Sequence, residues 1–200
     1  PDYFDFQRFS GGEFVAALAG TLAAESLTRV LYPDDSTVRG QGLRFLQEYF
    51  LVACSVGDLV RRFRRGNTNW DTLPEKVAIQ MNDTHPTMAV PELMRILLDD
   101  VHLGWDKAWD LTQRTLAYTN HTLLPEALEC WPVHLFGSIL PRHLEIIRQL
   151  NDRFLVSLPI TTDRREVGII ADHSVRMGHL AFIGSHKVNG VSALHTDLMK

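Results

Sequence analysis

The stretch that most constrains the fold is Lys76–Pro86, where a short apolar run leads directly into a polar cluster. The run Val77–Ile79 contains two β-branched residues in three, which predicts a short buried strand. Pro86 fixes the backbone for a turn or a helix start. Between them lie four polar residues, Asn82, Asp83, Thr84 and His85.

This polar cluster has two possible interpretations. In an open α/β sheet, ligands bind just beyond the carboxyl ends of the strands, so a carboxylate and an imidazole at that point indicate a binding site. The simpler interpretation is that Asn82, Asp83 and Thr84 only cap the next helix. The residues of this stretch leave both interpretations open.

Size and charge limit the class of protein. A chain of 200 residues can form one large domain or a pair of small ones. Its net charge is −4, and its arginines are scattered apart from Arg61–Arg65, so no nucleic-acid partner is expected. The sequence shows neither a signal peptide nor an apolar run of about 20 residues, so no membrane partner is expected. The abrupt ends are compatible with a piece of a longer protein.

The two cysteines, Cys54 and Cys130, lie in apolar surroundings in the sequence. This pattern predicts buried thiols in the reducing cytoplasm rather than a disulfide framework.

Helical periodicity covers much of the chain. Ser10-Gly11-Gly12-Glu13 has the spacing of a capping box and predicts a helix from there to Tyr32-Pro33, followed by a polar loop over 34–42. A second helix is expected over 43–65, and its middle, Tyr49–Cys54, is apolar on all sides and should be buried. Further helices are predicted over 91–100, 105–118, 140–155 and from 192 onward.

A second strand is predicted over Gly178–Gly184, emptying into a polar, glycine-punctuated loop over Ser185–Val191. Another polar cluster, Thr119–Thr122, follows the predicted helix 105–118. Pro125 with Glu126 and Glu129 has the pattern of a helix start with favourably placed carboxylates.

Common catalytic motifs are absent. The dinucleotide-binding, P-loop and nucleophile-elbow patterns do not occur. Asp83 and His85 could supply two metal ligands, but no further ligand motif supports a metal site. Glu126 and Glu129, three apart on one helix face, point the same way and do not form the opposed pair of a glycosidase.

Several stretches, in the same order along the chain, resemble the glycogen and α-glucan phosphorylase family. Those stretches are Arg29–Pro33, Gln47–Phe50, Val77–Pro86, Tyr118–Thr122, Leu124–Glu129, Leu140–Leu144 and Gly184–Val191. The similarity covers the later part of the family's N-terminal domain and ends before its C-terminal domain.

The resemblance implies a helix-rich part of a Rossmann-like N-terminal domain, in a two-domain glycosyltransferase (GT-B-like) fold. Such enzymes cleave the terminal α-1,4 bond of a glucan with inorganic phosphate and release glucose 1-phosphate with retention. Their pyridoxal 5'-phosphate is held on a lysine of the other domain. None of Lys76, Lys107, Lys187 and Lys200 matches that lysine's motif, so we expect no cofactor anchor here and no activity of the chain alone.

The resemblance also assigns site residues. His121 matches the catalytic histidine, which contacts the glucosyl unit and turns its main-chain carbonyl toward the developing charge at the anomeric carbon. The other matches are substrate-pocket and channel positions: Asn120, Asn189, Gly190 and Val191 in the sugar pocket, and Asp83, His85, Glu126, Ala127 and Glu129 along the channel. The alternative is a glucan-binding module without catalysis.

Three regions follow from the resemblance: a subunit-contact helix (1–32), a gate loop (33–42) and an α/β body (43–200). The helix over 11–31 would form a homodimer. The gate loop carries Asp34, Asp35 and Ser36 where regulated members have asparagine and aromatic residues, so we expect an enzyme without an aromatic gate. The implied location is the cytoplasm.

Overall fold

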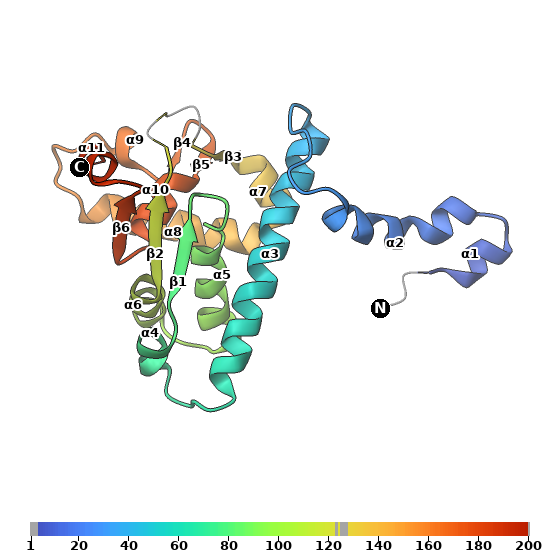
Figure 1. The fold of residues 1–200 in the computed structure, drawn as a ribbon, viewed down its shortest axis with the longest axis horizontal. Coiled ribbons are helices and arrows are strands. Elements are labelled where there is room, and N and C mark those ends of the chain that lie inside the picture. Colours follow the sequence, from blue (N-terminus) through green and yellow to red (C-terminus); the bar gives the residue numbers. More distant parts are fainter. Residues whose placement is uncertain (1–3, 123, 125–127, 200) are drawn as a thin grey trace. The chain divides into compact units, whose positions relative to one another are not determined.

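The computed structural model describes residues 4–122, 124 and 128–199. It divides into two compact units, Pro1–Phe50 and Leu51–Lys200 (Figure 1). Within the described ranges, no helix combines the length and the apolar character that crossing a membrane requires.

The first unit is helical. It contains α1 (Phe6–Ser10), α2 (Phe14–Arg29) and the beginning of α3 (Val38–Arg64), which continues into the second unit. The predicted capping box is wrong, because Ser10 ends α1 and Glu13 precedes α2 without a side-chain cap. The helix predicted after the box is present as α2.

The predicted loop over 34–42 is too long, because α3 already begins at Val38. Thr37 Oγ1 accepts a hydrogen bond from the Gly40 amide (3.1 Å), which caps the first turn of α3. A Cβ at Gly40 would lie 2.0 Å from the Asp34 carbonyl oxygen. Because glycine has no side chain, the backbone of Asp34 can lie against the first turn of α3.

The middle of α3 is not buried on all sides as predicted. Leu51 and Cys54 are exposed, whereas one stripe of the helix is buried at three- and four-residue spacing: Val52, Val56, Val60 and Phe63. The helix is thus amphipathic rather than enclosed. Cys130 is exposed as well, so the prediction of two buried thiols is wrong.

The second unit contains a parallel three-stranded sheet in the order β1-β2-β6. Its strands are β1 (Ile79–Asn82), β2 (Leu116–Asn120) and β6 (Lys187–Gly190), and the three arrows in Figure 1 point the same way. The first strand begins two residues later than predicted. It lies at the edge of the sheet, so only Met81 of this strand is buried.

The structure differs from the sequence prediction in two elements of this unit. Helix α6 (Trp105–Thr115) ends three residues early, because the backbone turns extended at Leu116 and continues as β2. The predicted strand over 178–184 is instead helix α10 (Met177–Ile183), whose buried residues Met177, Leu180 and Ala181 have helical spacing. The strand of this region is β6, which lies within the loop predicted over Ser185–Val191.

The remaining elements surround the sheet. The helices are η1 (Trp70–Thr72), α4 (Leu73–Lys76), α5 (Ala89–Arg95), η2 (Ile96–Asp100), α7 (Val133–Ile139), α8 (Pro141–Ser157), α9 (Arg164–Val167) and α11 (Ala193–Leu198). A small antiparallel sheet has the order β3 (Cys130–Pro132), β5 (Ser174–Arg176) and β4 (Ile170–Ala171). The architecture is a helix-rich α/β fold with a parallel sheet, as predicted.

The core is formed where α5 packs against α6 and α8. Residues Ala89–Met94 of α5 are all buried, as are Leu111 of α6 and Ile147 of α8.

Candidate functional site

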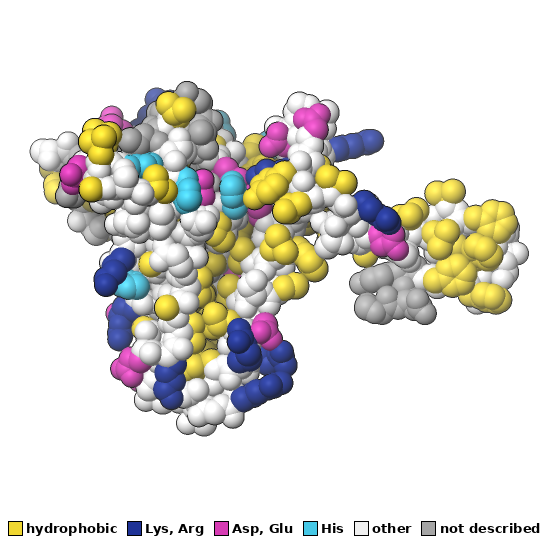
Figure 2. All heavy atoms as spheres, viewed as in Figure 1, with side chains coloured by type: hydrophobic (Ala, Val, Ile, Leu, Met, Phe, Trp, Pro, Cys, Tyr) yellow, Lys and Arg dark blue, Asp and Glu magenta, His cyan; other side chains and the backbone are white. Residues whose placement is uncertain are grey.

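The carboxyl ends of the three parallel strands meet at one edge of the sheet. Asn82 pairs with Thr119 and Asn120 pairs with Gly190. Asp83, His121 and Val191 come directly after these strand ends, so all three leave the sheet at the same edge. Figure 2 shows histidine side chains gathered at the end of the sheet to which the arrows in Figure 1 point.

The loop after β1 is held by its own polar residues. Asp83 has a left-handed backbone (φ 65°), and its amide donates to the Thr119 carbonyl (2.9 Å). Thr84 is buried and donates from Oγ1 to Glu129 Oε2 (2.7 Å), which connects this loop to the segment before β3. Helix α5 begins only at Ala89 and has no side-chain cap, so the predicted capping role is wrong.

The turn after β2 combines an exposed and a buried side chain. His121 is exposed, and its Nε2 donates to Asn82 Oδ1 (2.5 Å). Asn120 is only 6% exposed. Its Oδ1 accepts from the Thr122 amide (2.9 Å) and from His195 Nε2 (2.9 Å), and its Nδ2 donates to the Tyr118 hydroxyl (2.9 Å).

The turn after β6 lies against α11. The Gly190 amide donates to Thr196 Oγ1 (2.9 Å), and a Cβ at Gly190 would lie 2.6 Å from His195 Cδ2. Only a glycine permits this close approach. Asn189 connects the turn to β2, because its Oδ1 accepts from Thr119 Oγ1 (3.1 Å). Val191 follows and is exposed.

The phenol of Tyr118 is kept neutral. Burial raises its pKa, and the negative charges of Asp83 and Glu129 raise it further. Together these effects outweigh the hydrogen bond from Asn120, which lowers the pKa. The hydroxyl therefore keeps its proton at neutral pH, and it accepts from the Asn120 amide.

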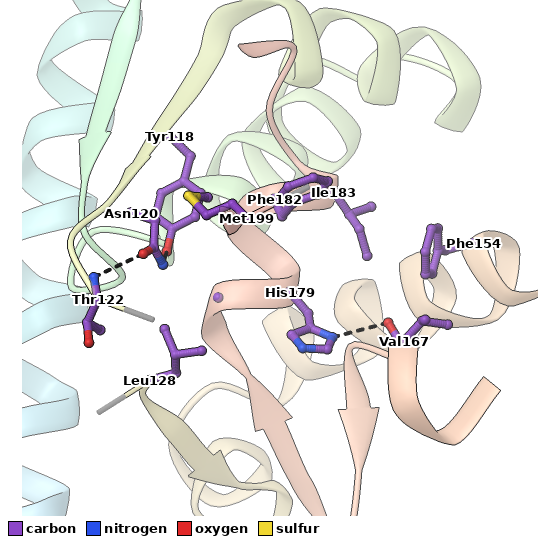
Figure 3. A pocket seen from close by; sticks show the side chains of 11 residues that line it. Tyr118, Asn120, Thr122, Leu128, Phe154, Val167, His179, Phe182, Ile183 and Met199 are labelled. Carbon is purple, nitrogen blue, oxygen red and sulfur yellow. Dashed lines mark hydrogen bonds between the residues drawn. The ribbon is translucent and has the colours of Figure 1, made fainter. Parts of the chain in front are cut away.

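A cavity of about 450 Å³ adjoins this edge of the sheet (Figure 3). One side comes from β2 and the turn after it, and another from α10, where His179 Nδ1 donates to the Val167 carbonyl (3.2 Å). Several of its lining side chains are apolar, among them Leu128, Phe182 and Met199. The cavity therefore offers an apolar surface beside a polar strand end.

Other predicted residues lie elsewhere or are outside the described residues. His85 is in the turn after Asp83 and is half-buried. Glu126 and Ala127 lie outside the described residues. Asp34, Asp35 and Ser36 form a loop of the first unit, where hydrogen bonds from the backbone and side chain of Ser36 lower the pKa of Asp34.

His195 is a polar residue of this edge that the sequence did not single out. Ser192, which caps α11, was the available signal for His195, because the cap places that histidine in the first turn after a predicted site loop. Across the described part of the chain, no three His, Cys, Asp or Glu side chains converge as metal ligands.

Comparison with known proteins identifies the class. The family model described as carbohydrate phosphorylase matches residues 1–200, so the chain belongs to this family. This confirms the resemblance found in the sequence.

Individual relatives are glycogen phosphorylases. The chain is 48% identical over 216 residues to the muscle forms of Rattus norvegicus and Homo sapiens, covering 100% of this chain and 26% of each relative. It is 50% identical over 206 residues to the glycogen phosphorylase of Haemophilus influenzae, covering 99% of this chain and 25% of the relative. The chain thus spans about a quarter of the length of these relatives.

Proposed function

We propose that the chain is part of an α-glucan phosphorylase, which transfers the terminal α-1,4-linked glucosyl unit of a glucan to inorganic phosphate. The product is glucose 1-phosphate with retained configuration. The observation that supports this proposal is the meeting of three polar strand ends, bearing Asp83, His121 and Val191, at one edge of a sheet in a member of the phosphorylase family.

In this proposal the chain forms one wall of the glucosyl pocket, within the Rossmann-like N-terminal half of a two-domain GT-B fold. Residues 1–32 form the subunit-contact region, 33–42 the gate loop and 43–200 the α/β body. The enzyme is a cytoplasmic homodimer in which α2 contributes to the subunit contact.

The described lysines do not fit a pyridoxal phosphate anchor at this edge. Lys76 and Lys107 bond with Asn67 and Asp71, and Lys187 begins β6, at the opposite end of that strand from Gly190. We therefore assign the cofactor to a part of the enzyme outside this chain. When bound, its phosphate group would supply a proton donor and acceptor.

The residues of this chain would bind and orient the sugar. His121 contacts the glucosyl unit, and its main-chain carbonyl faces the charge that develops at the anomeric carbon. A fixed dipole aimed at a developing charge stabilises the transition state more than the ground state. Asn189, Gly190 and Val191 line the same pocket.

Substrate-channel residues complete the proposed site. These are Asp83 and His85 after β1, together with Glu126, Ala127 and Glu129. Thr84 supports the arrangement, because its hydrogen bond fixes a carboxylate oxygen of Glu129 next to the loop that bears Asp83. Their role is to position the glucan rather than to make or break bonds.

The test is His121→Ala in the full-length enzyme, assayed for glucose 1-phosphate release from a maltooligosaccharide and phosphate. Loss of a sugar contact made in the transition state should lower kcat/KM by about tenfold to a hundredfold. His134→Ala is the control, because His134 is an exposed residue of α7. Equal activity of the two variants would contradict the assignment of His121.

A wild-type enzyme that binds maltooligosaccharide but releases no glucose 1-phosphate would instead indicate a glucan-binding module. The isolated 200-residue chain should be inactive, since the cofactor anchor is assigned elsewhere. Glucose 1-phosphate formed by the purified chain would contradict that division of the site.

A further inference from the structure

We infer that His195 is a positioning residue that holds two walls of the proposed glucosyl pocket, the turn after β2 and the turn after β6, in one fixed arrangement. This inference rests on the proposed function. Its basis is that the imidazole of His195 contacts both turns: Nε2 donates to Asn120 Oδ1 (2.9 Å), and Cδ2 lies 2.6 Å from the position that a Cβ on residue 190 would occupy.

The contact with Asn120 acts on the orientation of His121. Asn120 Oδ1 also accepts from the Thr122 amide (2.9 Å), and this bond closes an Asx turn around His121. The peptide groups on both sides of His121 are therefore fixed by one buried amide. That amide has two donors on its oxygen and the Tyr118 hydroxyl on its nitrogen, so its own rotation is fixed.

Without His195, the oxygen of Asn120 would keep one of these two donors in a site that is only 6% exposed. A buried acceptor that loses a donor costs free energy, which favours other side-chain conformations in which the acceptor is paired. The Asx turn would then loosen, and the His121 carbonyl would lose its fixed direction. A displacement of this kind lowers the rate more than it weakens substrate binding.

The second contact fixes the turn after β6. The ring of His195 lies against Gly190, while the neighbouring Thr196 accepts from the Gly190 amide (2.9 Å). The His195 amide donates to Ser192 Oγ (3.1 Å), which fixes the start of α11 itself. The turns after β2 and β6 are therefore both held by residues of the short helix α11, and His195 contacts both turns.

Two substitutions separate the hydrogen bond from the packing. His195→Phe keeps a ring against Gly190 and removes the donor to Asn120. His195→Gln removes the ring and keeps an N–H donor at a similar reach. In the full-length enzyme, His195→Phe should lower kcat about tenfold or more while KM for a maltooligosaccharide changes less than about threefold. His195→Gln should recover most of the lost kcat.

A second readout excludes a merely structural role. A cationic iminosugar mimics the charge of the transition state, so its affinity should fall in His195→Phe by a factor similar to the fall in kcat. A structural role would lower the unfolding temperature and leave both quantities unchanged in the folded enzyme. His134→Phe, on the exposed face of α7, is the matched control.

The outcomes are distinct. If His195→Phe does not fold, His195→Leu takes its place, because it also removes the donor to Asn120 and has a smaller apolar side chain; the same loss of kcat would support the inference. Wild-type kcat in the folded Phe variant, or in the Leu variant used in its place, would overturn it while leaving the proposed function intact. A wild-type enzyme without phosphorolysis would overturn both.

Discussion

The carboxylate of Glu92 on α5 and the imidazole of His143 on α8 are joined by a hydrogen bond of 2.5 Å, and each residue is 3% exposed. Arg95 also donates to Glu92 (2.9 Å). Burial opposes ionisation of this carboxyl, but the hydrogen bonds from His143 and Arg95 outweigh it and hold the pKa of Glu92 below its usual value. The ionised form therefore stabilises the contact between the two helices.

Glu92→Gln should lower the stability at pH 7 by about 2 kcal/mol, because a charged partner is lost from a buried network. A carboxyl whose pKa is lowered by folding contributes stability above its unfolded pKa of about 4.3 and loses that contribution as the pH falls through the folded pKa. The deficit of the variant should therefore shrink below about pH 4.3. Thermal unfolding between pH 7 and 3 measures this.

Glu145→Gln is the control for this prediction, since Glu145 is on α8, like His143, but its side chain is 57% exposed. An exposed ion pair contributes less than about 1 kcal/mol, so this variant should unfold close to the wild type. A deficit of Glu92→Gln that stays constant down to pH 3 would contradict the assigned pKa.

Gly40 and Gly42 differ in their surroundings although both lie in the first turns of α3. A Cβ at Gly40 would lie 2.0 Å from the Asp34 carbonyl, whereas one at Gly42 would meet nothing within 4 Å. Gly40→Ala should therefore displace the loop and speed its cleavage in limited proteolysis. Gly42→Ala should stabilise the helix by up to about 1 kcal/mol. Equal cleavage rates in the two variants would refute the steric argument.

At the scale of elements, the hairpin between β4 and β5 is strained. Its two turn residues, Asp172 and His173, both have positive φ (48° and 59°), as a two-residue type I′ turn requires. Glycine adopts this conformation without the cost of about 1 kcal/mol that other residues have. His173→Gly should raise the unfolding temperature, and His173→Val should lower it; the reverse order would contradict the strain.

Element types were predictable where periodicity was long and were wrong where it was short. The long helices α2, α3 and α8 agree with their apolar spacing. The central strand β2 was merged with α6, because no glycine or proline separates Thr115 from Leu116. The run at α10 was assigned to a strand, since the five apolar-rich residues between Gly178 and Gly184 fit either structure.

The candidate site was more predictable than its supporting strands. The polar cluster after the first predicted strand indicated Asp83, and the resemblance to the family indicated His121 and Val191, although β2 was not predicted and β6 was misplaced. In the structure these residues lie at one edge because parallel strands bring their carboxyl ends together. The contact of His195 with Asn120 joins residues 75 positions apart, and no local pattern in the sequence indicates it.

At the scale of the whole molecule, α2 has an apolar stripe that its own unit leaves exposed. Phe14, Leu18 and Leu22 recur every four residues, and all three are exposed (37–55%). In Figure 2, apolar side chains are prominent over the first unit. An exposed stripe of this kind is typical of a surface that another protein covers, and the proposed homodimer is the partner that we assign to it.

Leu18→Glu combined with Leu22→Glu should therefore convert the full-length dimer to monomers. Placing two carboxylates in an apolar contact removes burial and adds a desolvation cost, so the dimer dissociation constant should rise by at least about a hundredfold. Ala23→Glu is the control, because residue 23 is exposed and lies about two and a half helical turns from Phe14, on the opposite face of α2. Sedimentation velocity over a range of concentrations distinguishes the species. If the double variant sediments as the wild-type dimer, α2 lies outside the subunit contact.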